Sequence, residues 1–436
     1  MRNRFRNQLS KLGDLSVLRS GFKVLILRVC GVIFLFGITV FLTNFYPAEE
    51  VGAYEFTRSV LFLIGGFTIL GTDQSILFFS GRFSKKEQLG ALFKVYFKMV
   101  LLLLAGSIVL LILAWTIPSA VYQAVFNDET SGTLILKAAA CLFFYAITLL
   151  NTEFFRGFVL HQKSELYRGI FKQLPFGLGL LLLFLLRQHQ YVVEVFLLSY
   201  FLLAIVSSIE VFFQYKKRVS RDVQDLELSY KTVLKATIPI AISALGFYLL
   251  ISIDVFFLKH YTNFETLAYY GTSIKIIFLI ATVINTISSF IAVKIANLYA
   301  TNRQKLQELV KNGVRIIVIL TTVLSVFLML FSKVILQVFG TAYQQANTAL
   351  LILIVGHFLS SFFGITQVYL NMTKKQVVLQ YILIIAVLLN ALLNWVLIPK
   401  LGMEGAAIAS AVSVIFWNLS AALWVYKKDN IKLFLH

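Results

Sequence analysis

The sequence predicts an all-α integral membrane protein of about twelve transmembrane helices, arranged as two six-helix lobes around a central cleft. Three observations lead to this fold class. Apolar residues make up 59% of the 436 positions and charged residues only 14%, against about 25% charged residues in an average soluble domain. The apolar residues form long runs, and the basic residues gather between the runs. The sequence of the first half partly recurs in the second.

The apolar runs give the number of helices. A transmembrane helix needs about 20 predominantly apolar residues, and twelve runs of that kind occupy nearly the whole chain. The predicted spans are residues 21–45, 53–79, 95–117, 134–158, 167–186, 192–214, 236–258, 266–292, 313–337, 346–370, 377–398 and 404–426. Because the connections are short, no room remains for a separate soluble domain.

The N-terminal segment adds one further element. Residues 5–20 alternate basic and apolar side chains at helical spacing, which is typical of an amphipathic helix lying on the membrane surface. The apolar run that follows is too long for a signal peptide.

The basic residues indicate orientation. With the N-terminus in the cytoplasm, 30 of the 39 lysines and arginines fall on the cytoplasmic side, and four (Arg187, Lys259, Lys333 and Lys400) fall on the opposite side. This bias follows the positive-inside rule and predicts that both termini are cytoplasmic. It also explains the net charge of +19, so we expect no binding to nucleic acid.

An internal repeat predicts the two lobes. Residues 46–57 share Tyr, Glu, Ala, Tyr and Thr with residues 261–272 at a constant offset of 215. That offset contains six spans, so the halves run in the same direction, as in parallel-repeat transporters. We expect an N-terminal lobe over residues 1–220, with the amphipathic helix and spans 1–6, and a C-terminal lobe over residues 221–436, with spans 7–12.

Three cations inside the predicted spans are candidate substrate-binding residues. Arg28, Arg58 and Lys275 lie in the first, second and eighth spans. Because an ionisable group costs about 2.5–3.5 kcal/mol inside a membrane on insertion scales, each needs a reason to be there. They could bind the phosphates of an anionic lipid-linked substrate in the cleft. The alternatives are pairing with Asp73 or Asp254, or contact with lipid head groups.

The two acids have two possible roles. Asp73 follows Arg58 by 15 residues, which on one continuous helix places both within 60° of the same face. Either Asp73 or Asp254 could bind a coupling proton or sodium ion, or could balance the charge of a cleft cation, and we favour charge balance. Pro175 and Pro239 lie within or at the start of spans, where a proline can act as a hinge or as a static kink.

Other chemistry has weak support in the sequence. The two cysteines and five histidines show no metal-binding spacing, so we expect no metal site and no cofactor apart from a coupling ion. A membrane glycosyltransferase or polymerase could use Glu49 and Glu50 as catalytic carboxylates, but the outer loops are short. We therefore expect a transporter and not an enzyme.

Four stretches carry a family resemblance. They are EEVGAYEFTRSVLFLIGGFTILGTDQSILFF, SIDVFFLKHYTNFETLAYYGTSIKI, FGTAYQQANTALLIL and IPKLGMEGAAIASAVS. With these stretches in this order, the chain resembles over essentially its full length the Wzx-type oligosaccharide flippases of the polysaccharide transporter family, within the multidrug/oligosaccharidyl-lipid/polysaccharide (MOP) exporter superfamily.

The resemblance implies a function. Such a protein flips a polyprenyl-diphosphate-linked oligosaccharide from the cytoplasmic to the outer leaflet of the bacterial inner membrane, for synthesis of a cell-surface polysaccharide such as lipopolysaccharide, capsule or exopolysaccharide. Its partners would be that glycolipid, membrane lipids and a polysaccharide polymerase or other assembly proteins. Related lipid II flippases place cavity arginines at sites similar to Arg28 and Arg58, although they normally have two further spans.

A cation-coupled exporter of drugs or metabolites on the same fold is the alternative. That branch typically has an acid in the first or the seventh span. The first span here has none, whereas Asp254 supplies one in the seventh.

Overall fold

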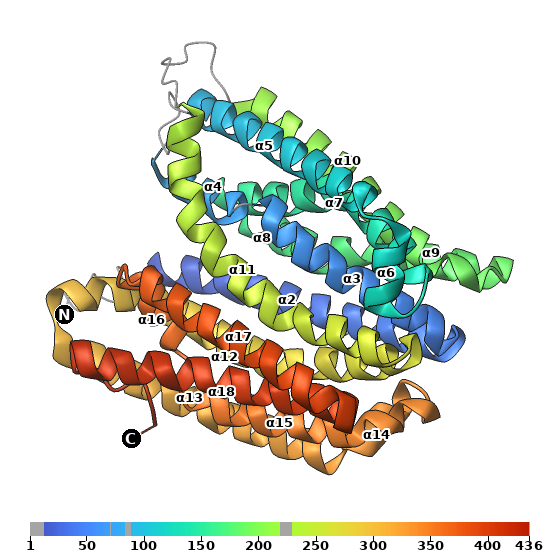
Figure 1. Ribbon diagram of the computed structural model, residues 1–436. Coiled ribbons are helices and arrows are strands. Elements are labelled where there is room, and N and C mark those ends of the chain that lie inside the picture. Colours follow the sequence, from blue (N-terminus) through green and yellow to red (C-terminus); the bar gives the residue numbers. More distant parts are fainter. Residues whose placement is uncertain (1–12, 70, 83–88, 219–228, 436) are drawn as a thin grey trace. The chain divides into compact units, whose positions relative to one another are not determined.

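The computed structural model describes residues 13–69, 71–82, 89–218 and 229–435, and within these ranges it contains helices and no strand. The chain forms long helices joined by short turns (Figure 1). This matches the composition, because a helix satisfies its backbone hydrogen bonds internally and can therefore lie in a membrane.

The helices of the first half follow the predicted runs. In chain order they are α2 (Gly13–Phe45), α3 (Ala48–Ile69), α4 (Thr72–Arg82), α5 (Leu89–Thr116), α6 (Ser119–Phe126), α7 (Thr130–Gly157), α8 (His161–Leu166), the π-helical turn η2 (Tyr167–Phe171), α9 (Lys172–Leu186), the 3-10 turn η3 (His189–Tyr191) and α10 (Val192–Arg218).

The second half is built in the same way. Its elements are α11 (Tyr230–Tyr261), α12 (Phe264–Thr301), α13 (Arg303–Leu330), α14 (Ser332–Val338), the 3-10 turn η4 (Thr341–Ala346), α15 (Asn347–Ser361), α16 (Thr366–Met372), α17 (Gln376–Leu401) and α18 (Met403–Asp429).

The predicted number of spans is confirmed by length and composition. Among the described residues, ten helices are long and apolar enough to cross a membrane, and two bent helix pairs bring the number to twelve. The pairs are α3 with α4 and α15 with α16. Of the predicted amphipathic helix over residues 5–20, residues 5–12 lie outside the described part of the chain, and residues 13–20 belong to α2, which continues into the first span.

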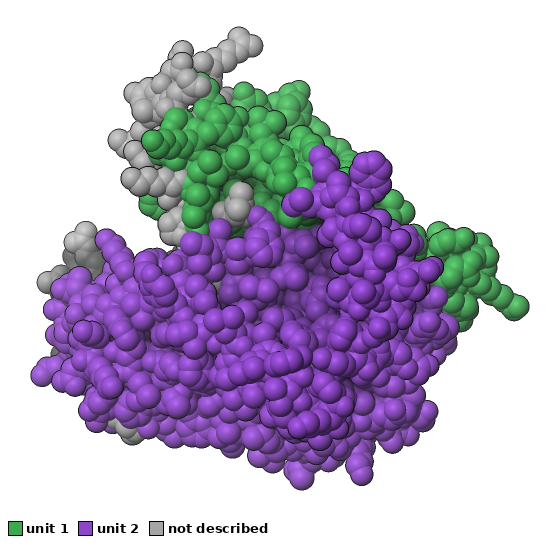
Figure 2. Space-filling model, viewed as in Figure 1, with its two compact units in different colours: residues 1–42, 68–111, 139–238 green, residues 43–67, 112–138, 239–436 purple. Residues whose placement is uncertain are grey.

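The chain separates into two compact units, shown in different colours in Figure 2. Unit 1 contains residues 1–42, 68–111 and 139–238, and unit 2 contains residues 43–67, 112–138 and 239–436. Several long helices therefore contribute residues to both units. The division into lobes at residue 220 stays a prediction.

One predicted helix is interrupted. The run over residues 53–79 is apolar throughout, but α3 ends at Ile69 and α4 begins at Thr72. Gly71 between them has a φ of +68°, which glycine adopts at little cost. The expectation that Arg58 and Asp73 share a face of one continuous helix is therefore wrong. They lie on different helices and in different compact units.

Candidate functional site

Two glycines let α3 and α12 approach closely within unit 2. A Cβ atom on Gly52 would come within 1.7 Å of the Phe264 carbonyl oxygen, so at this point the start of α3 touches the backbone at the start of α12. Two turns further along α12, a Cβ on Gly271 would lie 2.8 Å from Cγ of Glu55. The missing side chains make room for a carboxylate between the two helices.

That carboxylate joins two of the three predicted cations. Arg58, one turn after Glu55 on α3, lies with its Nη2 2.6 Å from Glu55 Oε2, and its Nε donates a hydrogen bond of 3.0 Å to the same oxygen. The Lys275 ammonium forms an ion pair with the other oxygen, Oε1. Glu55 is 1% exposed and Lys275 2%. We call these three residues the α3–α12 ion cluster.

Aromatic rings surround the cluster. The Lys275 ammonium lies 5.0 Å from the centroid of the Tyr54 ring, and the Arg58 guanidinium lies 5.4 Å from that of Phe62. Rings at these distances attract a cation through the negative potential of their faces. Both cations therefore contact the Glu55 carboxylate and an aromatic face.

Arg28, the third predicted cation, lies in unit 1 and has its own acid. Its Nη2 donates to Glu165 Oε1 at 2.9 Å, and Glu165, on α8, is buried. Close backbone packing nearby brings the helices together, because a Cβ on Gly31 would lie 2.9 Å from Cα of Gly169. Neither Asp73 nor Asp254 is the partner of any of the three cations in the ion pairs of the described residues.

Asp73 lies in the first turn of α4 and is buried. Its Oδ1 has no hydrogen-bond partner among the described residues. Unit 1 also contains Glu153, which pairs with Arg156 as its spacing of three residues predicts, at 3.5 Å. Arg168 forms a second ion pair with Glu153.

Asp254 is held by neutral donors. The Tyr270 hydroxyl donates to its Oδ2 at 2.6 Å, the Asn394 amide donates to its Oδ1 at 2.8 Å, and the Ser410 hydroxyl donates to Oδ2. Asp254 is 1% exposed. Asn394 also donates to Asn390 Oδ1 at 2.9 Å, so the seventh, eighth, eleventh and twelfth spans meet at this acid. We call this group the Asp254 cluster.

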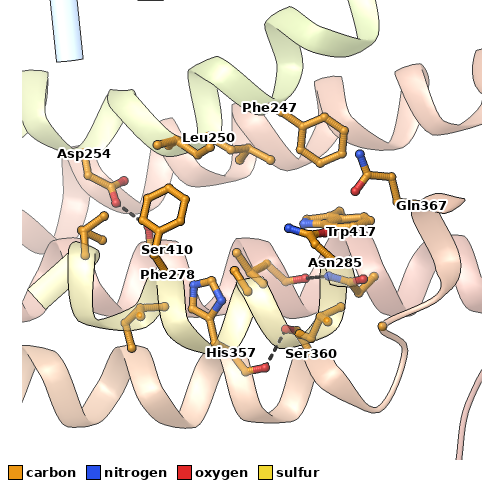
Figure 3. Close-up of a pocket in the computed structure, with 18 residues that line it drawn as sticks. Phe247, Leu250, Asp254, Phe278, Asn285, His357, Ser360, Gln367, Ser410 and Trp417 are labelled. Atoms are coloured by element: carbon orange, nitrogen blue, oxygen red, sulfur yellow. Dashed lines mark hydrogen bonds between the residues drawn. The ribbon is translucent and has the colours of Figure 1, made fainter. Parts of the chain in front are cut away.

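A cavity of about 220 Å³ begins beside this acid. Asp254 and Ser410 line one end of it, and Trp417, Asn285 and Gln367 line the other (Figure 3). Its walls come from α11, α12, α15, α16 and α18, all within unit 2.

The two prolines occupy different settings. Pro175 is the fourth residue of α9, and α9 directly follows the π-helical turn η2. A proline cannot donate to the carbonyl four residues before it, here that of Phe171, which is the last residue of η2. At Pro239 the helix α11 continues without a break, and the boundary between the two compact units falls between Ile238 and Pro239.

Sequence reasoning missed the acids that pair with the cations. Glu55 and Glu165 were not among the candidates, although Glu55 and Arg58 have the three-residue spacing that pairs side chains on a helix. The Asp254 partners could not be found in this way, because Asn394 and Ser410 lie 140 and 156 residues away in sequence.

Comparison with protein families matches residues 239–396 to the MatE family model. The match covers part of the second half of the chain, from within α11 into α17, and does not include α18. No curated protein sequence matches the chain.

Solved structures resemble nearly the whole chain. The lipid II flippase MurJ in an inward closed conformation matches with a TM-score of 0.72 and 12% identity, covering 94% of this chain and 87% of that one. The MATE multidrug transporter DinF-BH in complex with R6G matches with a TM-score of 0.71 and 15% identity over 97% of both chains. An inward-facing multidrug resistance MATE family transporter of the MOP superfamily matches with a TM-score of 0.69 and 16% identity, covering 94% of this chain and 98% of that one.

These similarities identify the fold. The chain has the two-lobe helical fold of these solved structures, and its long apolar helices indicate a multi-pass membrane protein. Glu49 and Glu50, the carboxylates that an enzyme could have used, lie in the first turn of α3, where acidic side chains interact favourably with the helix N-terminus.

Proposed function

We propose that the protein flips a polyprenyl-diphosphate-linked oligosaccharide from the cytoplasmic to the outer leaflet of the bacterial inner membrane by alternating access, during synthesis of a cell-surface polysaccharide. The observation that carries this proposal is the α3–α12 ion cluster, in which two cations share one buried carboxylate. The similarity of the fold to a lipid II flippase supports a lipid-linked substrate.

The cluster has the chemistry to exchange one anion for another. Glu55 balances one of the two positive charges of Arg58 and Lys275 inside the protein, where an unpaired charge would be costly. A substrate diphosphate could replace Glu55 as their partner, with Arg58 binding two oxygens through its planar fork and Lys275 acting as a point charge. The internal acid would also make release possible, since it can take back the cations when the substrate leaves.

Arg28 would bind phosphate in the same way. Its partner Glu165 is buried, while the arginine side chain is 29% exposed. Exchange of Glu165 for another anion should therefore require a smaller change in solvation at Arg28 than the corresponding exchange at Lys275.

We further propose that Asp254 couples transport to a proton or a sodium ion. Within the described residues its hydrogen-bond partners are neutral side chains, and it forms no ion pair. That favours ion coupling over the charge balance that we expected from the sequence. The Asn394 Oδ1 atom is buried without a hydrogen-bond partner among the described residues, and such carboxylate, amide and hydroxyl oxygens are suitable ligands for a hard cation.

Pro175 and Pro239 are proposed as hinges of the alternating-access movement. Support comes from the π-helical turn before Pro175, since such turns weaken the regular helix, and from the unit boundary at Pro239. Cytoplasmic termini and a polysaccharide polymerase as partner remain part of this proposal.

The test is translocation of a short polyprenyl-diphosphate oligosaccharide in proteoliposomes. We expect Arg58→Ala and Lys275→Ala each to lower the rate at least tenfold, and Arg58→Lys to keep more activity than Arg58→Ala. Arg156→Ala is the matched control, because it removes an arginine whose side chain is 47% exposed and which lies outside the ion cluster. Normal transport in both folded cluster variants would refute the role of the cations.

A cation-coupled exporter of drugs or metabolites is the second candidate. It is supported by the buried acid of the seventh span and by the similar fold of the multidrug transporters. The same proteoliposomes decide between the two. Failure of the parent to move the glycolipid, together with uptake of a cationic dye driven by a sodium or proton gradient and abolished by Asp254→Asn, would favour the exporter.

A further inference from the structure

We infer that the cavity in unit 2 binds a single sugar residue of the transported glycan, with the ring stacked on Trp417 and its hydroxyls bonded to Asn285, Gln367 and His357. This inference rests on the proposed function, because it assigns one part of the proposed substrate to a second site.

The polar side chains of the cavity have unused hydrogen-bonding capacity. Asn285, Gln367 and His357 come from α12, α16 and α15 and line the same space. Within the described part of the chain, the side chains of these three residues form no hydrogen bond. An amide offers donors and an acceptor together. That combination matches neighbouring sugar hydroxyls, each of which donates and accepts.

The aromatic wall suits the other surface of a sugar. Trp417 and Phe247 meet edge to face, with ring centroids 5.6 Å apart, and the Trp417 ring lies between Asn285 and Gln367 (Figure 3). The C–H face of a pyranose is apolar and gains dispersion energy on a flat ring. The indole of Trp417 can therefore stack against the apolar face of a sugar ring, while the amides beside it form hydrogen bonds with the hydroxyls at the edge of the ring.

A break in the tenth span supplies one of the amides. The helix stops at Ser361 and resumes at Thr366, so that Gln367 enters the cavity from α16. The Ser288 hydroxyl donates to the carbonyl of Gly364 inside the break at 3.1 Å. Non-helical backbone at membrane depth is tolerated where it lines a cavity, and Gly364 in this break does so.

The size of the cavity favours one sugar over a drug. Drug-sized ligands occupy pockets of about 300–1,000 Å³, whereas this one measures about 220 Å³. A cationic drug would also find the Asp254 carboxylate already bonded to Tyr270, Asn394 and Ser410.

The experiment measures binding of methyl glycosides to the purified protein in nanodiscs. The panel contains methyl glucoside, galactoside, mannoside and N-acetylglucosaminide, and binding is followed by saturation-transfer NMR. We expect at least one glycoside to bind, and Trp417→Leu and Asn285→Leu each to weaken it at least tenfold. Trp395→Leu is the matched control, since Trp395 is 61% exposed and does not line the cavity. Asn285→Leu keeps the test valid if Trp417→Leu does not fold, because the Asn285 side chain is exposed.

Binding of the same glycolipid, with and without its sugar, separates this inference from the proposed function. Trp417→Leu and Asn285→Leu should weaken binding of the glycosylated lipid and leave binding of the bare polyprenyl diphosphate unchanged. If the parent binds the glycoside through Trp417 but does not bind polyprenyl diphosphate, the flippase proposal fails and the sugar site stands. If the parent translocates the glycolipid and both variants do so equally well, or if the parent binds no glycoside of the panel, the sugar site is refuted.

Discussion

Glu55 and Asp254 are both 1% exposed carboxylates in the same compact unit, yet their surroundings satisfy them in different ways. Glu55 lies between two cations, and Asp254 accepts hydrogen bonds from three neutral side chains. The two sites are linked by the internal repeat, because Tyr270, which donates to Asp254, follows Glu55 by the repeat offset of 215. Thr39 occupies the position of Asp254 in the first half.

The difference teaches what each site can exchange. A carboxylate bonded only by neutral donors keeps its negative charge, which a proton or a sodium ion can balance. A carboxylate between two cations leaves a net positive charge on the three groups, which an anion can balance. At the repeat position where the first half has the acid Glu55, the second half has Tyr270, which donates a hydrogen bond to Asp254.

Glu55→Gln should have the largest effect on stability. The amide removes the negative charge that Arg58 and Lys275 share, and breaking a buried ion pair in this way costs about 3–5 kcal/mol. Unfolding of nanodisc samples by denaturant would measure the loss.

Two further samples show whether charge is the cause. Adding Lys275→Met should recover part of the stability, and inorganic diphosphate should stabilise Glu55→Gln more than the parent. An unchanged unfolding midpoint in Glu55→Gln would mean that water already solvates the cluster.

Gly271→Ala tests whether the tight helix contact builds the cluster. Its Cβ would lie 2.8 Å from Cγ of Glu55, so the carboxylate must move away from Lys275. Overpacking of this kind costs about 1–3 kcal/mol. Gly37→Ala is the control, because a Cβ there meets nothing within 4 Å and alanine favours a helix. Equal stability of the two variants would show that the cluster tolerates a wider gap.

Ser410→Ala tests whether hydrogen bonds from neutral side chains stabilise the buried Asp254 carboxylate. It removes one of three donors to a buried carboxylate, and hydrogen bonds to charged groups contribute about 1.5–3 kcal/mol. We expect a loss near the lower value, about 1.5 kcal/mol, because Tyr270 and Asn394 remain. The control is Ser413→Ala on the same helix, whose hydroxyl donates to the backbone oxygen of Ala409. A loss in Ser410→Ala no larger than in the control would indicate that Asp254 is already neutral.

The sequence predicted the helices better than their contacts. Apolar runs located every span, because crossing a membrane requires a length and a composition that can be counted. The break at Gly71 was missed because the run on both sides is apolar, although Gly-Thr-Asp is a typical helix start. Arg58 and Lys275 were found as costly charges. Glu55 was not, since its burial depends on Gly271 more than 200 residues away, and contacts at that separation leave no periodic signal.

Substitution of Asp128 should have the smallest effect on stability, because this carboxylate is more exposed than Glu55 and Asp254. It pairs with Lys259, which is 4% exposed, and accepts from the backbone N–H of Ser131 at 2.6 Å. Burial alone would raise the pKa of Asp128, but the hydrogen bonds from Lys259 and Ser131 outweigh it and lower that pKa below its usual value.

The sign of the pH effect follows from this shift. A carboxyl whose pKa is lowered on folding stabilises the protein above its unfolded pKa of about 3.9, and loses that contribution as the pH falls through the folded value. The thermal unfolding midpoint of the parent should therefore fall as the pH drops below about 4, and Asp128→Asn should remove part of that fall. Glu129→Gln, at the exposed neighbouring carboxylate, should leave this fall in the unfolding midpoint unchanged.

The loss of stability in Asp128→Asn should be much smaller than that in Glu55→Gln, because the Asp128 side chain is 26% exposed and water screens its pair with Lys259. An acid sensitivity identical in Asp128→Asn and the parent would show that Lys259 is held by the Phe126 carbonyl, to which it donates at 3.2 Å, and not by its acid.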